Sequence, residues 1–231
     1  MFLPLILILI GFSGILLSNI YSQNSDSRII MFNIYNAYAQ FTFLFVSFIY
    51  IYYFSEDFNK GGYAFYKQIG YSLKACFKIK SFILFLISAI TVDIFLILAA
   101  LFLKIGDLVF ISTTIISMTI CLLYNIVFSA FLSFIFKKTM VATVINFAIY
   151  IISNVLNLIT FGLINPMDGN SLNTVIIKYL ASNTVTHKTL SKFSDKFHPW
   201  EFPLSTVIPF IYTIVFIVIL YLLTKEKKRK L

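Results

Sequence analysis

Residues 81–103 read SFILFLISAITVDIFLILAALFL, an apolar run that contains one charged side chain, Asp93. A helix needs about 20 such residues, at 1.5 Å rise each, to cross a hydrocarbon core roughly 30 Å thick. Only helices and closed barrels span lipid, because lipid offers backbone amides no hydrogen-bond partner. Barrel strands alternate over about ten residues, whereas this run is longer and apolar on all sides. We therefore predict a transmembrane helix.

Five other runs have comparable length and character. Together the predicted spans are about residues 2–20, 34–54, 81–103, 109–136, 142–164 and 203–224. Charged residues make up 12% of the chain, against about 25% in soluble domains. We expect an all-α, polytopic integral membrane protein with six transmembrane helices, forming a single transmembrane domain over residues 1–231.

Basic residues are distributed unequally between the two sides that six spans define. One side carries 12 of the 18, since its two loops and its tail contribute 5, 2 and 5. These are Lys60, Lys67, Lys74, Lys78 and Lys80, then Lys137 and Lys138, then Lys225, Lys227, Lys228, Arg229 and Lys230. The positive-inside rule places this side, with both termini, in the cytoplasm. The net charge of +9 therefore reflects topology and contact with membrane lipid, and we expect no nucleic-acid partner.

The first cytoplasmic loop, residues 55–80, contains a predicted amphipathic helix. Gly61 and Gly62 break the chain before it. At 100° per residue, Tyr66, Ile69, Leu73 and Phe77 fall on one face, and Lys67, Lys74 and Lys78 on a second. Such a helix either lies on the lipid surface or docks on a soluble partner.

The long loop on the external side, residues 165–202, contains a second amphipathic pattern. Ser171 is a candidate N-cap, and apolar residues follow it with helical spacing. They are Leu172, Val175, Ile176, Tyr179 and Leu180. We expect a short helix lying flat at the outer surface.

Motifs for catalysis or metal binding are missing from the sequence. It contains no GxxxxGK[ST] phosphate loop, no HExxH and no GxSxG. His187 and His198 lie in the external loop with a spacing that does not suggest a metal site. Cys76 and Cys121 are expected to remain unpaired thiols. We therefore expect no enzyme activity, no metal and no cofactor in this chain.

Asp93 lies near the middle of its predicted span, where an ionisable residue costs roughly 2.5–3.5 kcal/mol on insertion scales. It must therefore face protein, water or a polar partner. The candidate partners are Asn125, Asn146, Asn154 and Asn157. Two interpretations remain open. Asp93, Asn125, Asn154 and Asn157 line a cargo path, or Asp93 is an interhelical hydrogen-bonded contact.

The order of these features resembles type-2 ABC transporter permeases, the membrane subunits of many bacterial exporters, and in particular short peptide-export or bacteriocin-immunity permeases. The local similarity lies in the first loop: the acidic pair Glu56 and Asp57, the turn at Gly61 and Gly62, the helical stretch 66–77, and Lys78 or Lys80 entering the next span. In that family this loop forms the coupling helix that docks on the ATPase.

The resemblance implies a division of labour between subunits in the bacterial cell membrane. A separate ABC ATPase subunit would bind ATP and Mg²⁺, and a second permease subunit, identical or homologous, would complete the membrane unit. The implied coupling residues are Glu56, Asp57, Tyr66, Lys67, Ile69, Leu73, Lys74, Phe77 and Lys78. The cargo would be a peptide, lipid or drug. The alternatives are a substrate-capture subunit of an energy-coupling vitamin or metal importer, and a non-transport immunity or scaffold protein.

Overall fold

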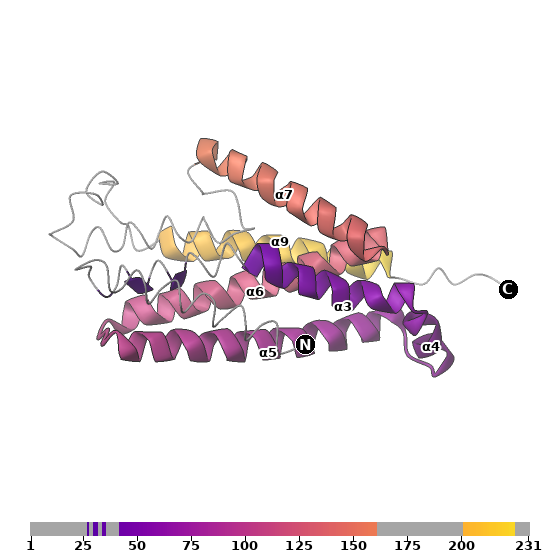
Figure 1. Ribbon diagram of the computed structural model, residues 1–231, viewed down its shortest axis with the longest axis horizontal. Helices are drawn as coiled ribbons and strands as arrows, with labels where there is room; N and C mark the ends of the chain where they lie inside the picture. The colour runs from indigo at the N-terminus through magenta and orange to yellow at the C-terminus, as the bar shows by residue number, and fades with distance from the viewer. Residues whose placement is uncertain (1–26, 28–29, 32–33, 36–41, 161–200, 225–231) are drawn as a thin grey trace.

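The computed structural model describes residues 27, 30, 31, 34, 35, 42–160 and 201–224, which are helical apart from short turns and contain no strand. The elements are a π-helix, η1 (Thr42–Val46), and the α-helices α3 (Ser47–Asn59), α4 (Gly62–Gln68), α5 (Leu73–Phe102), α6 (Leu108–Phe136), α7 (Thr139–Thr160) and α9 (Glu201–Leu223). The long helices form an elongated bundle, and α4 lies at one end of it (Figure 1). The all-helical expectation is confirmed for this part of the chain.

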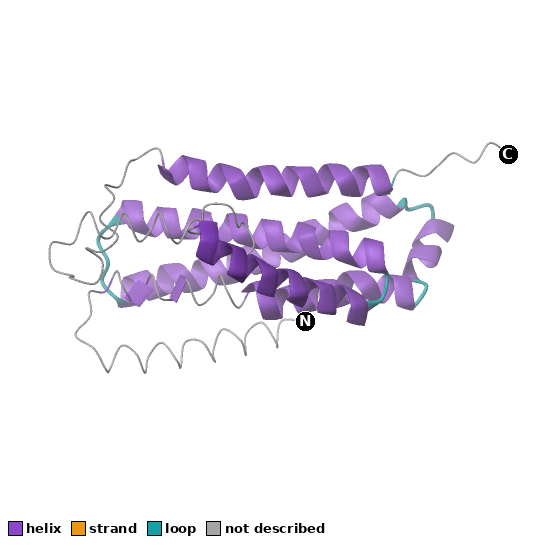
Figure 2. Cartoon of the chain, turned by 90° about the horizontal axis from the view of Figure 1, so that it is seen from above, coloured by secondary structure: helices purple, strands orange, loops and turns teal. Residues whose placement is uncertain are grey.

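Helix α6 is the central helix of the bundle. It packs against α3, α5, α7 and α9, and Figure 2 shows the long helices running lengthwise beside one another. In their most apolar stretches, 67% of α6 residues are buried, against 28% for α5. Both helices are long and apolar enough to cross a membrane. The apolar surface of α5 is thus left mostly uncovered by the chain itself, which suits contact with lipid or with another membrane helix.

The helix boundaries agree with three of the predicted spans and differ at a fourth. Helices α6, α7 and α9 lie within a few residues of the predicted spans 109–136, 142–164 and 203–224. Helix α5 begins at Leu73 rather than at Ser81, because the Ser72 side chain caps it by accepting a hydrogen bond from the Ala75 amide at 3.3 Å. Hydropathy detects the apolar part of such a helix and misses its polar first turns.

Two other predicted spans and the external helix are described in part or not at all. Element η1 and helix α3 cover the second half of the span at 34–54, and α3 continues beyond it to Asn59. The span at 2–20 and the helix expected in the loop at 165–202 lie outside the described residues.

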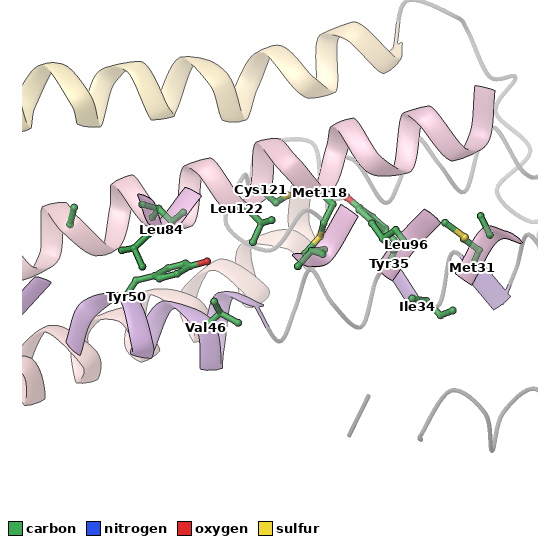
Figure 3. Packing of buried hydrophobic residues seen from close by; sticks show 14 of the residues in the cluster. Met31, Ile34, Tyr35, Val46, Tyr50, Leu84, Leu96, Met118, Cys121 and Leu122 are labelled. Carbon is green, nitrogen blue, oxygen red and sulfur yellow. The ribbon is translucent and has the colours of Figure 1, made fainter. Parts of the chain in front are cut away.

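The core consists of aromatic and aliphatic side chains between α3, α5 and α6. Figure 3 shows Tyr50 near Leu84 and Val46, and Leu96 beside Tyr35 farther along the bundle. The Tyr50 hydroxyl donates to Ser88 Oγ at 2.6 Å, so this buried phenol is satisfied. The contact connects α3 to α5 through a polar bond inside an otherwise apolar cluster.

Small hydroxyl residues allow α3 and α6 to approach closely. Ser129 and Ser133, one turn apart on α6, are fully buried. Ser133 Oγ lies 3.2 Å from the Ile51 carbonyl of α3. On the next helix, Asn146 Nδ2 donates to Ser47 Oγ at 3.0 Å. Such small and polar contacts are typical of helix packing in membranes, where no hydrophobic force draws helices together.

Candidate functional site

Helix α4 and its two flanking turns form a hairpin between α3 and α5. The turn before α4 contains Gly61 in the left-handed conformation, with φ of +71°, which a residue with a Cβ rarely adopts. A Cβ added to Gly62 would lie 2.9 Å from Asp57 Oδ1 and 3.3 Å from the Asp57 Cα. The glycine pair is therefore required both for the turn and for the close approach of α4 to the end of α3.

An aromatic cluster holds the inner side of the hairpin. The Phe58 and Tyr63 rings lie 4.3 Å apart, and Tyr63 stacks on Phe77 at 5.6 Å. Phe77 also stacks on Phe54 at 5.6 Å and meets Phe134 of α6 edge-on at 5.8 Å. Burial raises the pKa of the Tyr63 phenol. The cluster joins α4 to three longer helices.

An ion pair between Asp57 and Lys80 connects the end of α3 to the start of α5 beneath α4. The two side chains are only 14% and 13% exposed. Lys80 Nζ also lies 4.6 Å from the centre of the Tyr53 ring and 6.0 Å from that of Tyr66. A largely desolvated cation is costly to leave without its partner, and the two aromatic faces add favourable cation–π contact. The pair therefore constrains the base of the hairpin.

The predicted continuous helix over residues 66–77 is wrong. Helix α4 ends at Gln68, Gly70 adopts φ of +87°, and α5 starts at Leu73. The cause is the combination of a left-handed glycine with the cap at Ser72, which starts a new helix in a new direction. The predicted apolar face is therefore divided. Phe77 is buried and Leu73 packs against the core, whereas Ile69 is exposed.

A different set of apolar side chains is exposed on the hairpin. Phe65, Ile69 and Tyr71 are 58%, 53% and 52% exposed. Phe65 and Ile69 are one turn apart and face the same way. We call these three residues the hairpin tip. Sequence reasoning missed Phe65 and Tyr71, although Gly70 was the signal that the helical face could not continue past Ile69.

The remaining predicted coupling residues lie around the hairpin. Glu56 accepts a hydrogen bond from Lys60 Nζ at 2.5 Å, and this contact lowers the pKa of the Glu56 carboxyl. Tyr66 is half-buried above Lys80, and Lys67 is exposed on α4. Lys74 and Lys78 lie in the first turns of α5, on the side that faces α9. The structure therefore brings the set together at one end of the bundle.

Two contacts show which other segments share this end. Asn59 Nδ2 donates to Thr139 Oγ1 at 3.3 Å, which joins the end of α3 to the start of α7. Lys74 Nζ lies 3.7 Å from the centre of the Tyr221 ring, which joins the start of α5 to the end of α9. The two basic loops and the helix that leads into the basic tail are therefore neighbours.

Asp93, which the sequence placed on a possible cargo path, contacts a threonine of the neighbouring helix α6. Thr119 Oγ1 of α6 lies 3.3 Å from both carboxyl oxygens of Asp93 and 2.9 Å from the Ile115 carbonyl. Within the described part of the chain this threonine, and not Asn125 or Asn146, is the partner of Asp93. Of the candidate partners, Asn125 and Asn146 therefore do not bind Asp93, because a hydroxyl on the facing turn of α6 is nearer.

The structure describes the side chains of two of the four candidate asparagines. Asn125 is buried in α6, and its Oδ1 has no hydrogen-bond partner among the described residues. Asn146 binds Ser47 instead of Asp93. The side chains of Asn154 and Asn157 lie outside the described residues. In the described ranges no three His, Cys, Asp or Glu side chains group as metal ligands.

A comparison with known protein families gives one match over the whole chain. The model of the family described as "Peptide export permease protein YydJ family" matches residues 1–231. Neither the curated proteins nor the solved structures contain a match. The family match confirms the resemblance to peptide-export permeases.

Proposed function

We propose that this chain is the membrane subunit of an ATP-driven peptide exporter. The chain belongs to the peptide export permease protein YydJ family and is thus a membrane permease component of a transporter. ATP and Mg²⁺ would bind to a separate ABC ATPase subunit. A second permease subunit, identical or homologous, would complete the transport unit in the bacterial cell membrane.

The observation that carries the proposal is the hairpin at the end of the bundle. Its inner side is joined rigidly to α3, α5 and α6 by the aromatic cluster and by the Asp57–Lys80 pair. At its tip, Phe65, Ile69 and Tyr71 are each more than half exposed. A rigid element with an exposed apolar tip can transmit the movement of a soluble subunit into the membrane helices. We assign the hairpin tip as the docking face for the ATPase.

Co-purification tests the proposed function directly. The tagged chain would be isolated from its native membrane in mild detergent, and its partners would be identified by mass spectrometry. An ABC ATPase in near-stoichiometric amount is expected. Retention of a vitamin in its place would favour a substrate-capture subunit, and absence of both would favour an immunity or scaffold protein. Either result would overturn the exporter proposal.

The proposed topology places the hairpin in the cytoplasm. Cys76 and Cys121 would first be replaced by alanine. Three variants with one cysteine each would then be made, Gln68→Cys, Lys138→Cys and Ser191→Cys. A membrane-impermeant thiol reagent is expected to label Ser191→Cys in intact cells, and the other two only in inverted vesicles, because basic loops remain inside. Labelling of Gln68→Cys and Ser191→Cys from one side would contradict the topology.

We expect Asp93→Asn to preserve folding and to reduce export severalfold. The amide keeps the size of the side chain and the contact with Thr119, and an interhelical hydrogen bond in membranes is worth only about 0.6 kcal/mol. Loss of the ionisable group would affect a cargo path. Export would be measured at matched protein levels, with Thr119→Val as the control for loss of the hydrogen bond. Unchanged export in Asp93→Asn would make Asp93 a structural contact.

A further inference from the structure

A groove of about 340 Å³ runs between α5, α6 and α9. This volume lies at the small end of the range for ligand sites, about 300–1,000 Å³. Its wall is apolar and includes Phe82 and Phe85 of α5, Val127 of α6, and Ile217 and Leu220 of α9. Phe82 is largely exposed beside the groove. The groove is therefore open along the surface of α5 that the chain leaves mostly uncovered.

The depth of the groove corresponds to one leaflet. From Lys74 to Phe85, its first and last lining residues on α5, the helix rises about 16 Å at 1.5 Å per residue. This is close to half of a hydrocarbon core roughly 30 Å thick. An extended acyl chain in one leaflet would follow the same path.

The end of the groove nearest the hairpin is cationic. Lys74 and Lys78 line it there, and Lys74 Nζ is held over the Tyr221 ring. Among the described residues neither lysine forms an ion pair, whereas the two acids of the hairpin are paired with Lys60 and Lys80. An ammonium group is a common partner of phosphate. The mouth is therefore complementary to an anionic headgroup.

We propose that this groove binds one anionic phospholipid, with its phosphate at Lys74 and Lys78 and an acyl chain along Phe82, Phe85 and Leu220. The basic tail at residues 225–230, KEKKRK, has the wrong sign to occupy the mouth. The bound lipid would join the start of α5 to the end of α9, directly beside the hairpin.

Tryptophan quenching by brominated lipids tests the proposal. The reporter would be Phe85→Trp in a background in which the single native tryptophan is removed by Trp200→Phe, with the full chain in phosphatidylcholine vesicles. The vesicles would contain a minor fraction of one brominated lipid, either phosphatidylglycerol or phosphatidylcholine. We expect brominated phosphatidylglycerol to quench more strongly. Changing both lysines to glutamine should remove this preference. Each substitution should lower the apparent affinity for phosphatidylglycerol about fivefold.

Two control variants separate the site from ordinary lipid contact. Ile94→Trp, exposed on α5 outside the groove, should be quenched equally by both lipids. Lys67→Gln, which removes a charge outside the groove, should leave the preference at Phe85→Trp unchanged. Equal quenching of Phe85→Trp by both lipids would overturn the proposal, as would a preference that survives the double lysine substitution. Quenching by neither lipid would mean that protein, such as a second copy, covers the groove, and would overturn it as well.

Discussion

Replacing Phe65 and Ile69 by aspartate is expected to release the ATPase partner and abolish export, while the membrane domain stays folded. Both side chains are more than half exposed, so the substitutions remove no core contact. Ile69 has φ of −89° and ψ of 13°, a conformation that aspartate also adopts. If the two residues are anchors at a subunit interface, each typically contributes about 2 kcal/mol or more, roughly thirtyfold in affinity.

Co-purification of the ATPase and export at matched protein levels measure this effect. The control is Leu108→Asp, which changes an equally apolar, 77% exposed residue at the opposite end of the bundle. It follows Asp107 in the first turn of α6, where a negative charge is favourable, so we expect normal association and export. A doubly substituted hairpin tip that still retains the ATPase and still exports would remove the assignment of the docking face.

Breaking the Asp57–Lys80 pair should give the largest loss of stability among charge substitutions in the hairpin. Removing one partner of a fully buried pair costs about 3–5 kcal/mol, because the other charge is left uncompensated. The slight exposure of both side chains reduces the expected cost to about 2–3 kcal/mol for Asp57→Asn or Lys80→Gln. The double variant should be more stable than the sum of the single losses predicts, since it leaves no unpaired charge.

Thermal unfolding of the purified protein in detergent would measure these losses. A cross-link between cysteines on α4 and α5 would report whether α4 keeps its position next to α5. The matched control is Lys60→Gln, which breaks the neighbouring Glu56–Lys60 pair. That pair is solvent-exposed, and exposed pairs add little to stability, so the melting temperature should not change. Equal effects of Lys80→Gln and Lys60→Gln would show that the Asp57–Lys80 pair does not fix the hairpin.

The hairpin illustrates how far sequence reasoning reaches. The glycine turn at Gly61 and Gly62 was readable, because glycine pairs interrupt helices locally. The break in the helical face from Tyr66 to Phe77 could not be predicted, because the apolar periodicity continues across the position where the chain turns. The left-handed conformation of Gly70 and the cap at Ser72 redirect the chain. Whether Phe77 points outward or inward then depends on Phe54 and Phe134, which belong to other helices.

The membrane character and the main helices follow from sequence alone. A long run that is apolar on every side has to be helical in lipid, because each backbone amide must find its partner within the segment. The runs at 109–136, 142–164 and 203–224 became helices with nearly those bounds for this reason. The family, too, was recognisable from the order of spans and loops.

Tertiary structure alone decided which residues meet. Lipid and protein interior are both apolar, so hydrophobic pattern does not distinguish the face of a membrane helix that packs on protein from the face that borders lipid. The pairing of Asp93 with Thr119 and of Asp57 with Lys80, and the central position of α6, depend on contacts between distant segments. Such contacts arise when small and polar side chains let two helices approach, which a single helix does not reveal.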